Sequence, residues 1–151
     1  MGIDSVGSGD WNTGANWDGG TKPGAGNWAY IGNGNSITTT GAEAASRVWV
    51  GHARVVGSAG TGTLDITSGS TVTMGTETFR LGETNDGTMF VRNGGTFNRA
   101  SGGSWGQIGV NADGVLNVES GGTFLWDNGG SGQGFFVLVT FFNLLLSCFY
   151  H

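Results

Sequence analysis

The sequence predicts an all-β protein folded as a parallel β-solenoid (β-helix), with three-strand rungs of about 25–27 residues. A twelve-residue motif occurs three times, at residues 62–73, 87–98 and 114–125, so 25 and 27 residues separate successive starts. Such a period is typical of solenoids, whose units bury their apolar side only against their neighbours. The chain also has 32 glycines, one proline and only 11% charged residues. This composition suits many short strands joined by tight turns.

A second motif, a short apolar pair that ends in glycine, completes each repeat. It occurs at residues 48–51, 79–82 and 106–109, with a looser copy at residues 29–32. In the last two repeats its glycine precedes the twelve-residue motif by the same five positions. Each repeat is therefore expected to contain three strands.

Side chains alternate across a strand, so apolar residues two positions apart share one face. Stacking the repeats predicts three inward columns that are apolar throughout, as a solenoid core requires. The outward positions include Arg92 and Glu119, which we expect to form an ion pair between adjacent rungs. The inward columns are Val50, Leu81 and Ile108; Leu64, Ile66, Met89, Val91, Leu116 and Val118; and Val72, Phe97 and Phe124.

Residues 1–28 are rich in glycine, asparagine and tryptophan, and they predict a loop-like N-terminal cap. Trp11, Trp17 and Trp28 are expected to cover the open end of the solenoid, because terminal repeats must hide their apolar face. The alternative interpretation is a carbohydrate-binding platform, because flat aromatic rings stack on pyranose rings.

The repeats are assigned to residues 29–134. They open with expected strands at residues 29–32, 37–40 and 47–51, and residues 42–46 are interpreted as a short helical turn.

The composition changes after Gly134, the last glycine of the chain. Residues 135–151 hold thirteen apolar residues and no charged one. This tail is shorter than the roughly 20 apolar residues of a membrane span, and no charges flank it. It is interpreted as a last strand and hydrophobic plug, a truncated anchor, or a segment foreign to the repeat, so membrane contact stays open.

The charge disfavours nucleic-acid binding, and the cysteine content excludes an internal disulfide. The net charge of −5 disfavours nucleic acid, which requires clustered lysine and arginine. The single cysteine, Cys148, allows no internal disulfide. No signal peptide is visible, so the first residue is expected to mark a fragment boundary.

The acidic residues are dispersed, and no catalytic constellation or cofactor is expected from them. Glu83, Asp86 and Asp113 come nearest to a cluster, because they fall in equivalent turns of adjacent repeats. They are weak calcium candidates, and a solvated turn is the simpler interpretation. His52 has no partner at metal-ligand spacing.

Residues 8–126 resemble a known group of proteins. The segments Asp10-Trp11-Asn12, Asn16-Trp17 and Ala29-Tyr-Ile31, followed by Gly-Thr-Leu-x-Ile-x-x-Gly repeats, are similar to the passenger regions of bacterial autotransporter-type and autotransporter-associated β-strand repeat proteins. The resemblance implies an extracellular, right-handed β-helix on a bacterial cell surface.

The function expected from these observations is a non-catalytic structural or adhesive module of a bacterial surface protein. A carbohydrate-binding or carbohydrate-processing β-helix is the alternative. The expected partners are a second copy of the chain, through the solenoid ends or the apolar tail, and polysaccharide.

Overall fold

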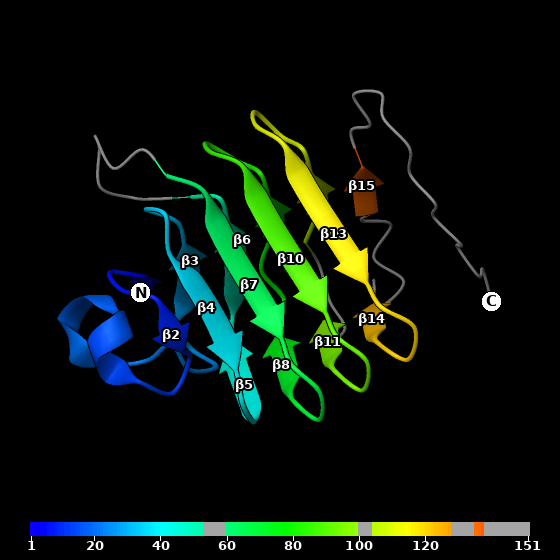
Figure 1. The fold of residues 1–151 in the computed structure, drawn as a ribbon. Helices are drawn as coiled ribbons and strands as arrows, with labels where there is room; N and C mark the ends of the chain where they lie inside the picture. The colour runs from blue at the N-terminus through cyan, green and yellow to red at the C-terminus, as the bar shows by residue number, and fades with distance from the viewer. Residues whose placement is uncertain (53–59, 100–103, 128–134, 138–151) are drawn as a thin grey trace.

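The computed structural model describes residues 1–52, 60–99, 104–127 and 135–137, and it confirms an all-β solenoid. The strands form three parallel sheets, and successive rungs stack along one axis (Figure 1). Each sheet takes one strand from every rung, so neighbours in a sheet are distant in sequence. The interior between the three sheets holds the core.

The six-stranded sheet has the order β1-β3-β6-β9-β12-β15. The glycine-ending motif supplies four of these strands, and β3, β6, β9 and β12 pair in the predicted register. The bounds are β1 Gly2–Asp4, β3 Trp28–Ile31, β6 Arg47–Val50, β9 Phe79–Leu81, β12 Gly106–Ile108 and β15 Phe135–Val137.

The five-stranded and four-stranded sheets have the orders β13-β10-β7-β4-β2 and β14-β11-β8-β5. The two halves of the twelve-residue motif supply three strands to each. The bounds in the first are β2 Gly9–Asp10, β4 Ser36–Thr39, β7 Gly62–Ile66, β10 Gly87–Val91 and β13 Gly114–Val118. The bounds in the second are β5 Ala42–Ala45, β8 Thr71–Met74, β11 Thr96–Arg99 and β14 Thr123–Trp126.

The helical turn predicted at residues 42–46 is wrong, because β5 occupies this segment. Glu43 and Ala45 pair with Val72 and Met74 of β8, and both point into the interior. Lateral pairing with the next rung therefore overrides the weak local pattern. The acidic side chain is accommodated because Lys22 Nζ lies 3.2 Å from the Glu43 carboxylate.

The predicted inward columns form the core, and most of their members are fully buried. Leu116 and Phe124 are only partly buried, and the largest departure is Val118, with 41% of its surface exposed. It lies on β13, which pairs with β10 alone among the described strands. The register was therefore predicted correctly, but burial fails where no described rung follows.

The glycines that bound the strands have a steric role. Gly51, Gly82 and Gly109, which close the shorter motif, have φ angles of 80°, 77° and 71°. Side chains rarely adopt this left-handed conformation, which glycine adopts freely. Gly87 opens the twelve-residue motif, and a Cβ atom there would lie less than 3 Å from the Val50 carbonyl oxygen.

The N-terminal segment is more ordered than the predicted loop-like cap. β1 extends the six-stranded sheet and β2 extends the five-stranded sheet, so both join the first rung. Between them and β3 lie two 3₁₀ helices, η1 Gly14–Asn16 and η2 Asp18–Gly20. In the described ranges, no helix has the length and apolar character needed to cross a membrane.

Candidate functional site

Aromatic and guanidinium groups gather on the outer face of the six-stranded sheet. Each glycine-ending motif has one outward residue between its apolar pair. The sheet register places these residues in one row along the axis, namely Tyr30, Trp49, Arg80 and Gln107. A second row two positions earlier contains Trp28, Arg47, Thr78 and Trp105. We call these two rows the aromatic–arginine face.

Two arginines stack on tryptophan rings of this face. The guanidinium carbon of Arg47 lies 4.3 Å from the Trp28 ring centre and 4.6 Å from the Trp49 ring centre. That of Arg80 lies 4.7 Å from the Trp49 ring centre. Such cation–π contacts hold the arginines at defined positions above the sheet.

Each of these arginines also binds a carboxylate. Arg47 Nη2 donates to Glu77 Oε2 at 2.9 Å, and Arg80 Nη1 donates to Glu83 Oε1. Arg80 Nε donates to Gln107 Oε1 on the next rung at 3.0 Å. The ion pairs offset the positive charge of the face, and the amide contact fixes the orientation of Gln107.

His52 packs at the edge of the same face. Its ring centre lies 4.7 Å from that of Trp49 and 5.0 Å from that of Tyr30. Its Nδ1 atom lies 3.9 Å from Glu83 Oε2. His52, Tyr30 and Trp49 therefore form one aromatic cluster beside the Arg80–Glu83 pair.

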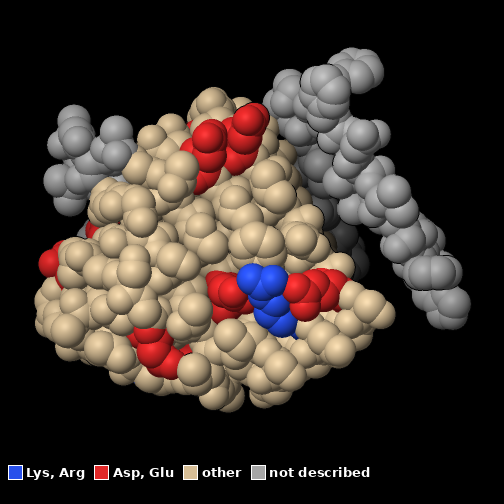
Figure 2. Space-filling view, viewed as in Figure 1, with Lys and Arg blue, Asp and Glu red and all other residues tan. Residues whose placement is uncertain are grey.

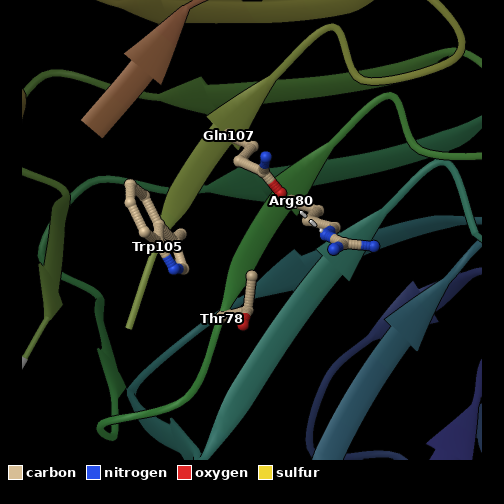
Figure 3. A pocket seen from close by; sticks show the side chains of 4 residues that line it. All are labelled: Thr78, Arg80, Trp105 and Gln107. Atoms are coloured by element: carbon tan, nitrogen blue, oxygen red, sulfur yellow. Dashed lines mark hydrogen bonds between the residues drawn. The ribbon is translucent and has the colours of Figure 1, made fainter. Parts of the chain in front are cut away.

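The face contains a shallow open pocket of about 470 Å³, lined by Thr78, Arg80, Trp105 and Gln107 (Figure 3). We call it the Trp105 pocket. Trp105 is 42% exposed, which leaves much of its indole accessible to solvent. Gln107 and Arg80 lie on one side of the pocket and Trp105 on the other.

The outer face of the five-stranded sheet differs in character. Figure 2 shows a largely uncharged surface whose central basic patch lies between two acidic ones, with further acidic groups nearer the edges. Arg92 donates to both Asp65 oxygens at 2.8 Å and to Glu119 Oε1 at 2.7 Å, which confirms the predicted Arg92–Glu119 ion pair. The hydrogen bond from Arg92 lowers the pKa of Glu119, and a second from the Asn93 backbone adds to this effect.

The structure places Trp11 and Trp17 away from any surface. They are 0% and 1% exposed, and their rings meet edge to face with centres 5.0 Å apart. The Trp11 indole N–H donates to the Pro23 carbonyl oxygen, and the Trp17 indole N–H donates to the Trp11 carbonyl oxygen. Both rings are therefore buried, and the alternative carbohydrate-platform interpretation finds no accessible ring at these two positions. Trp28 is half-buried on the aromatic–arginine face.

The weak calcium candidates lie where the repeat predicted them, in equivalent turns. The Asp113 backbone N–H donates to Asp86 Oδ1 at 3.1 Å, which links the two turns. Glu83 instead binds Arg80. Within the described ranges, no three histidine, cysteine, aspartate or glutamate side chains lie close enough together to hold a metal ion.

The aromatic–arginine face was not predicted from the sequence. The sequence feature that marks this face is the middle residue of each glycine-ending motif. In chain order these residues are Tyr30, Trp49, Arg80 and Gln107. These residue types differ from rung to rung, so no column of one chemistry marked the site. The alternation of the strands identifies them as outward but does not show that they share a function.

Comparison with families of known sequences, with curated proteins and with solved structures finds no match to this chain.

Proposed function

We propose that this chain is a non-catalytic structural and adhesive module of an extracellular bacterial surface protein. In this role the solenoid is a scaffold, and its aromatic–arginine face contacts the surface to which the protein adheres. The bacterial, extracellular assignment rests on the resemblance of the Gly-Thr-Leu-x-Ile-x-x-Gly repeats to autotransporter passenger regions.

One observation carries the adhesive role, namely the double row on a single sheet in which six of the eight outward residues are aromatic or arginine, although Tyr30 among them is only 3% exposed. Tryptophan, tyrosine and arginine are enriched where proteins bind partners, because they combine a large contact area with polar groups. The register aligns them along the solenoid axis, so the face is suited to an extended ligand or surface.

The scaffold supports this role because its rungs are held together by in-register contacts. Arg92 joins β7, β10 and β13 through Asp65 and Glu119. Contacts of this kind keep side chains on adjacent rungs at fixed spacing. A rigid array loses little conformational entropy when it binds, which favours adhesion.

The non-catalytic part of the proposal is supported by how the acids of this face are used. Glu77 binds Arg47, and Glu83 binds Arg80. General acid–base chemistry requires carboxyl groups directed at a substrate, with pKa values matched to proton transfer. Carboxylates that neutralise stacked arginines are better suited to hold the face in place.

The test is a bead-retention assay. Beads coated with the chain are passed over immobilised bacterial polysaccharides and bacterial cells, and blank beads of equal charge are the control. We expect retention of the coated beads and no release of shortened sugar chains. The proposal would be overturned if the coated beads were retained on none of these surfaces, or if shortened sugar chains were released.

A further inference from the structure

The Trp105 pocket has the chemistry of a site for an acidic sugar. Resting on the adhesive function proposed above, we infer that it binds a uronate unit of an acidic polysaccharide. The pyranose ring stacks on Trp105, and the uronate carboxylate accepts hydrogen bonds from Arg80 and Gln107.

The hydrogen bonds inside the pocket determine which groups are left for a ligand. Gln107 Oε1 accepts from Arg80 Nε, so the amide orientation is fixed and its Nε2 hydrogens remain as donors. Arg80 uses Nη1 for Glu83, and its Nη2 makes no hydrogen bond within the described ranges. The pocket therefore presents N–H donors, which require a ligand with acceptor oxygens.

A carboxylate fits these donors better than a hydroxyl group. Charge-assisted hydrogen bonds from a guanidinium group are shorter and stronger than neutral ones. Among the residues that the structure describes, the lining includes one arginine and no acidic side chain. Glu83 partly offsets the arginine charge from outside the lining, so we expect selectivity for the acidic form and not an absolute requirement for it.

The aromatic contact supplies the shape of the ligand. Trp105 is 42% exposed beside the pocket, so a flat ring can lie against it. Figure 3 shows the indole on the opposite side of the pocket from the Gln107–Arg80 pair. A pyranose with one carboxylate at its edge satisfies both sides at once.

The alignment of these residues in rows suits a ligand that contains several sugar units. Thr78 and Trp105 continue the row that begins at Trp28 and Arg47, and this row runs along the solenoid axis. A chain bound at Trp105 can therefore extend over Arg47, whose guanidinium group also carries positive charge.

The experiment compares polygalacturonate fragments with the same fragments after methyl esterification, by calorimetry at 0.15 M salt. At this salt concentration the Debye length is about 8 Å, so the net charge of −5 is largely screened. We expect the acidic form to bind more tightly. Equal affinity for the two forms would overturn the carboxylate assignment.

Two variants locate the site. Trp105→Ala should weaken binding at least about tenfold, as is usual for a central aromatic contact. Gln107→Glu keeps an acceptor for Arg80 Nε but places a negative charge in the pocket, so it should reduce the preference for the acidic form. Phe90→Ala, on the outer face of the five-stranded sheet, is the matched control and should leave the affinity unchanged.

The two proposals fail in different ways. If the beads adhere but neither fragment binds, or Trp105→Ala binds as the unchanged chain does, the uronate inference is wrong and adhesion stands. If the beads adhere to nothing, the adhesive function itself is wrong. Thermal unfolding of each variant checks that a loss of binding is not a loss of fold.

Discussion

Arg80 and Trp49 are register partners on β9 and β6, and the guanidinium carbon lies 4.7 Å from the indole centre. The contact joins adjacent rungs on the outside of the solenoid. The outward positions of the other two sheets are mainly threonine and asparagine. Because Arg80 also binds Gln107 on the following rung, one side chain connects the aromatic cluster to the Trp105 pocket. A change at Arg80 is therefore expected to affect both the cluster and the pocket.

Trp11 and Trp105 provide the clearest contrast between a structural and a binding tryptophan. Trp11→Ala should destabilise the fold by about 3–5 kcal/mol, because it leaves a cavity under the first rung. Trp105→Ala should cost clearly less than Trp11→Ala, because Trp105 is 42% exposed and its removal leaves no enclosed cavity, whereas Trp11 is 0% exposed. Urea unfolding measures both values. Equal losses of stability would contradict the assignment of the two roles.

Gly87 should not tolerate a side chain. Gly87→Ala places a Cβ atom against the backbone of β6, so we expect a loss of at least about 1–3 kcal/mol, as is usual for overpacking. Gly26→Ala is the matched control, because no atom lies within 4 Å of its added Cβ and its φ angle is not positive. Thermal unfolding of the pair checks the prediction, which fails if the two variants have the same midpoint.

Glu119 should contribute a pH-dependent part of the stability. The Arg92 hydrogen bond lowers its folded-state pKa below the ordinary value of 4.5. The contribution is therefore complete above pH 4.5 and is lost as the pH falls through the folded-state pKa. The stability difference between the unchanged chain and Glu119→Gln should shrink below pH 4.5, measured by urea unfolding across that range. A difference that is independent of pH would contradict the role of this ion pair.

The rung formed by β12, β13 and β14 should promote self-association. β13 and β14 each pair with one strand, so neither has a partner on its outer edge among the strands that the structure describes. Val115, Val118 and Leu125 on this rung are 50%, 41% and 50% exposed. Open edges with exposed apolar side chains pair with other chains.

Replacing these three residues with lysine should lower the average molar mass toward that of a monomer in light scattering after gel filtration. Val6→Lys is the control, because Val6 is 58% exposed at the opposite end of the solenoid. An unchanged mass in the triple variant, or an equal decrease in the control, would contradict association through this rung.

The fold was predictable because the repeats combine apolar alternation with glycine at fixed positions. Leu64, Met89 and Leu116 align because any one-residue slip would move a charged or polar neighbour into the core. β5 was missed because its inward residues are Glu43 and Ala45, which do not form an apolar pattern. Its conformation depends on pairing with β8, and local sequence does not contain that information.

The candidate site was much less predictable than the fold. Trp11 and Trp17 drew attention because tryptophan is unusual in a polar segment, but the path of that segment buries both rings. Trp49 and Arg80 looked like ordinary outward residues. Their importance depends on which side chains the register brings together, and only the three-dimensional arrangement defines this.

The indole N–H signals of the six tryptophans test the central claim most directly. In a ¹⁵N-correlated NMR spectrum, titration with polygalacturonate fragments should shift the Trp105 signal and, to a smaller extent, that of Trp49. The signals of the buried Trp11 and Trp17 should stay in place. This result would locate adhesion at the aromatic–arginine face. A shift of the Trp11 or Trp17 signal with no change at Trp105 would contradict the account.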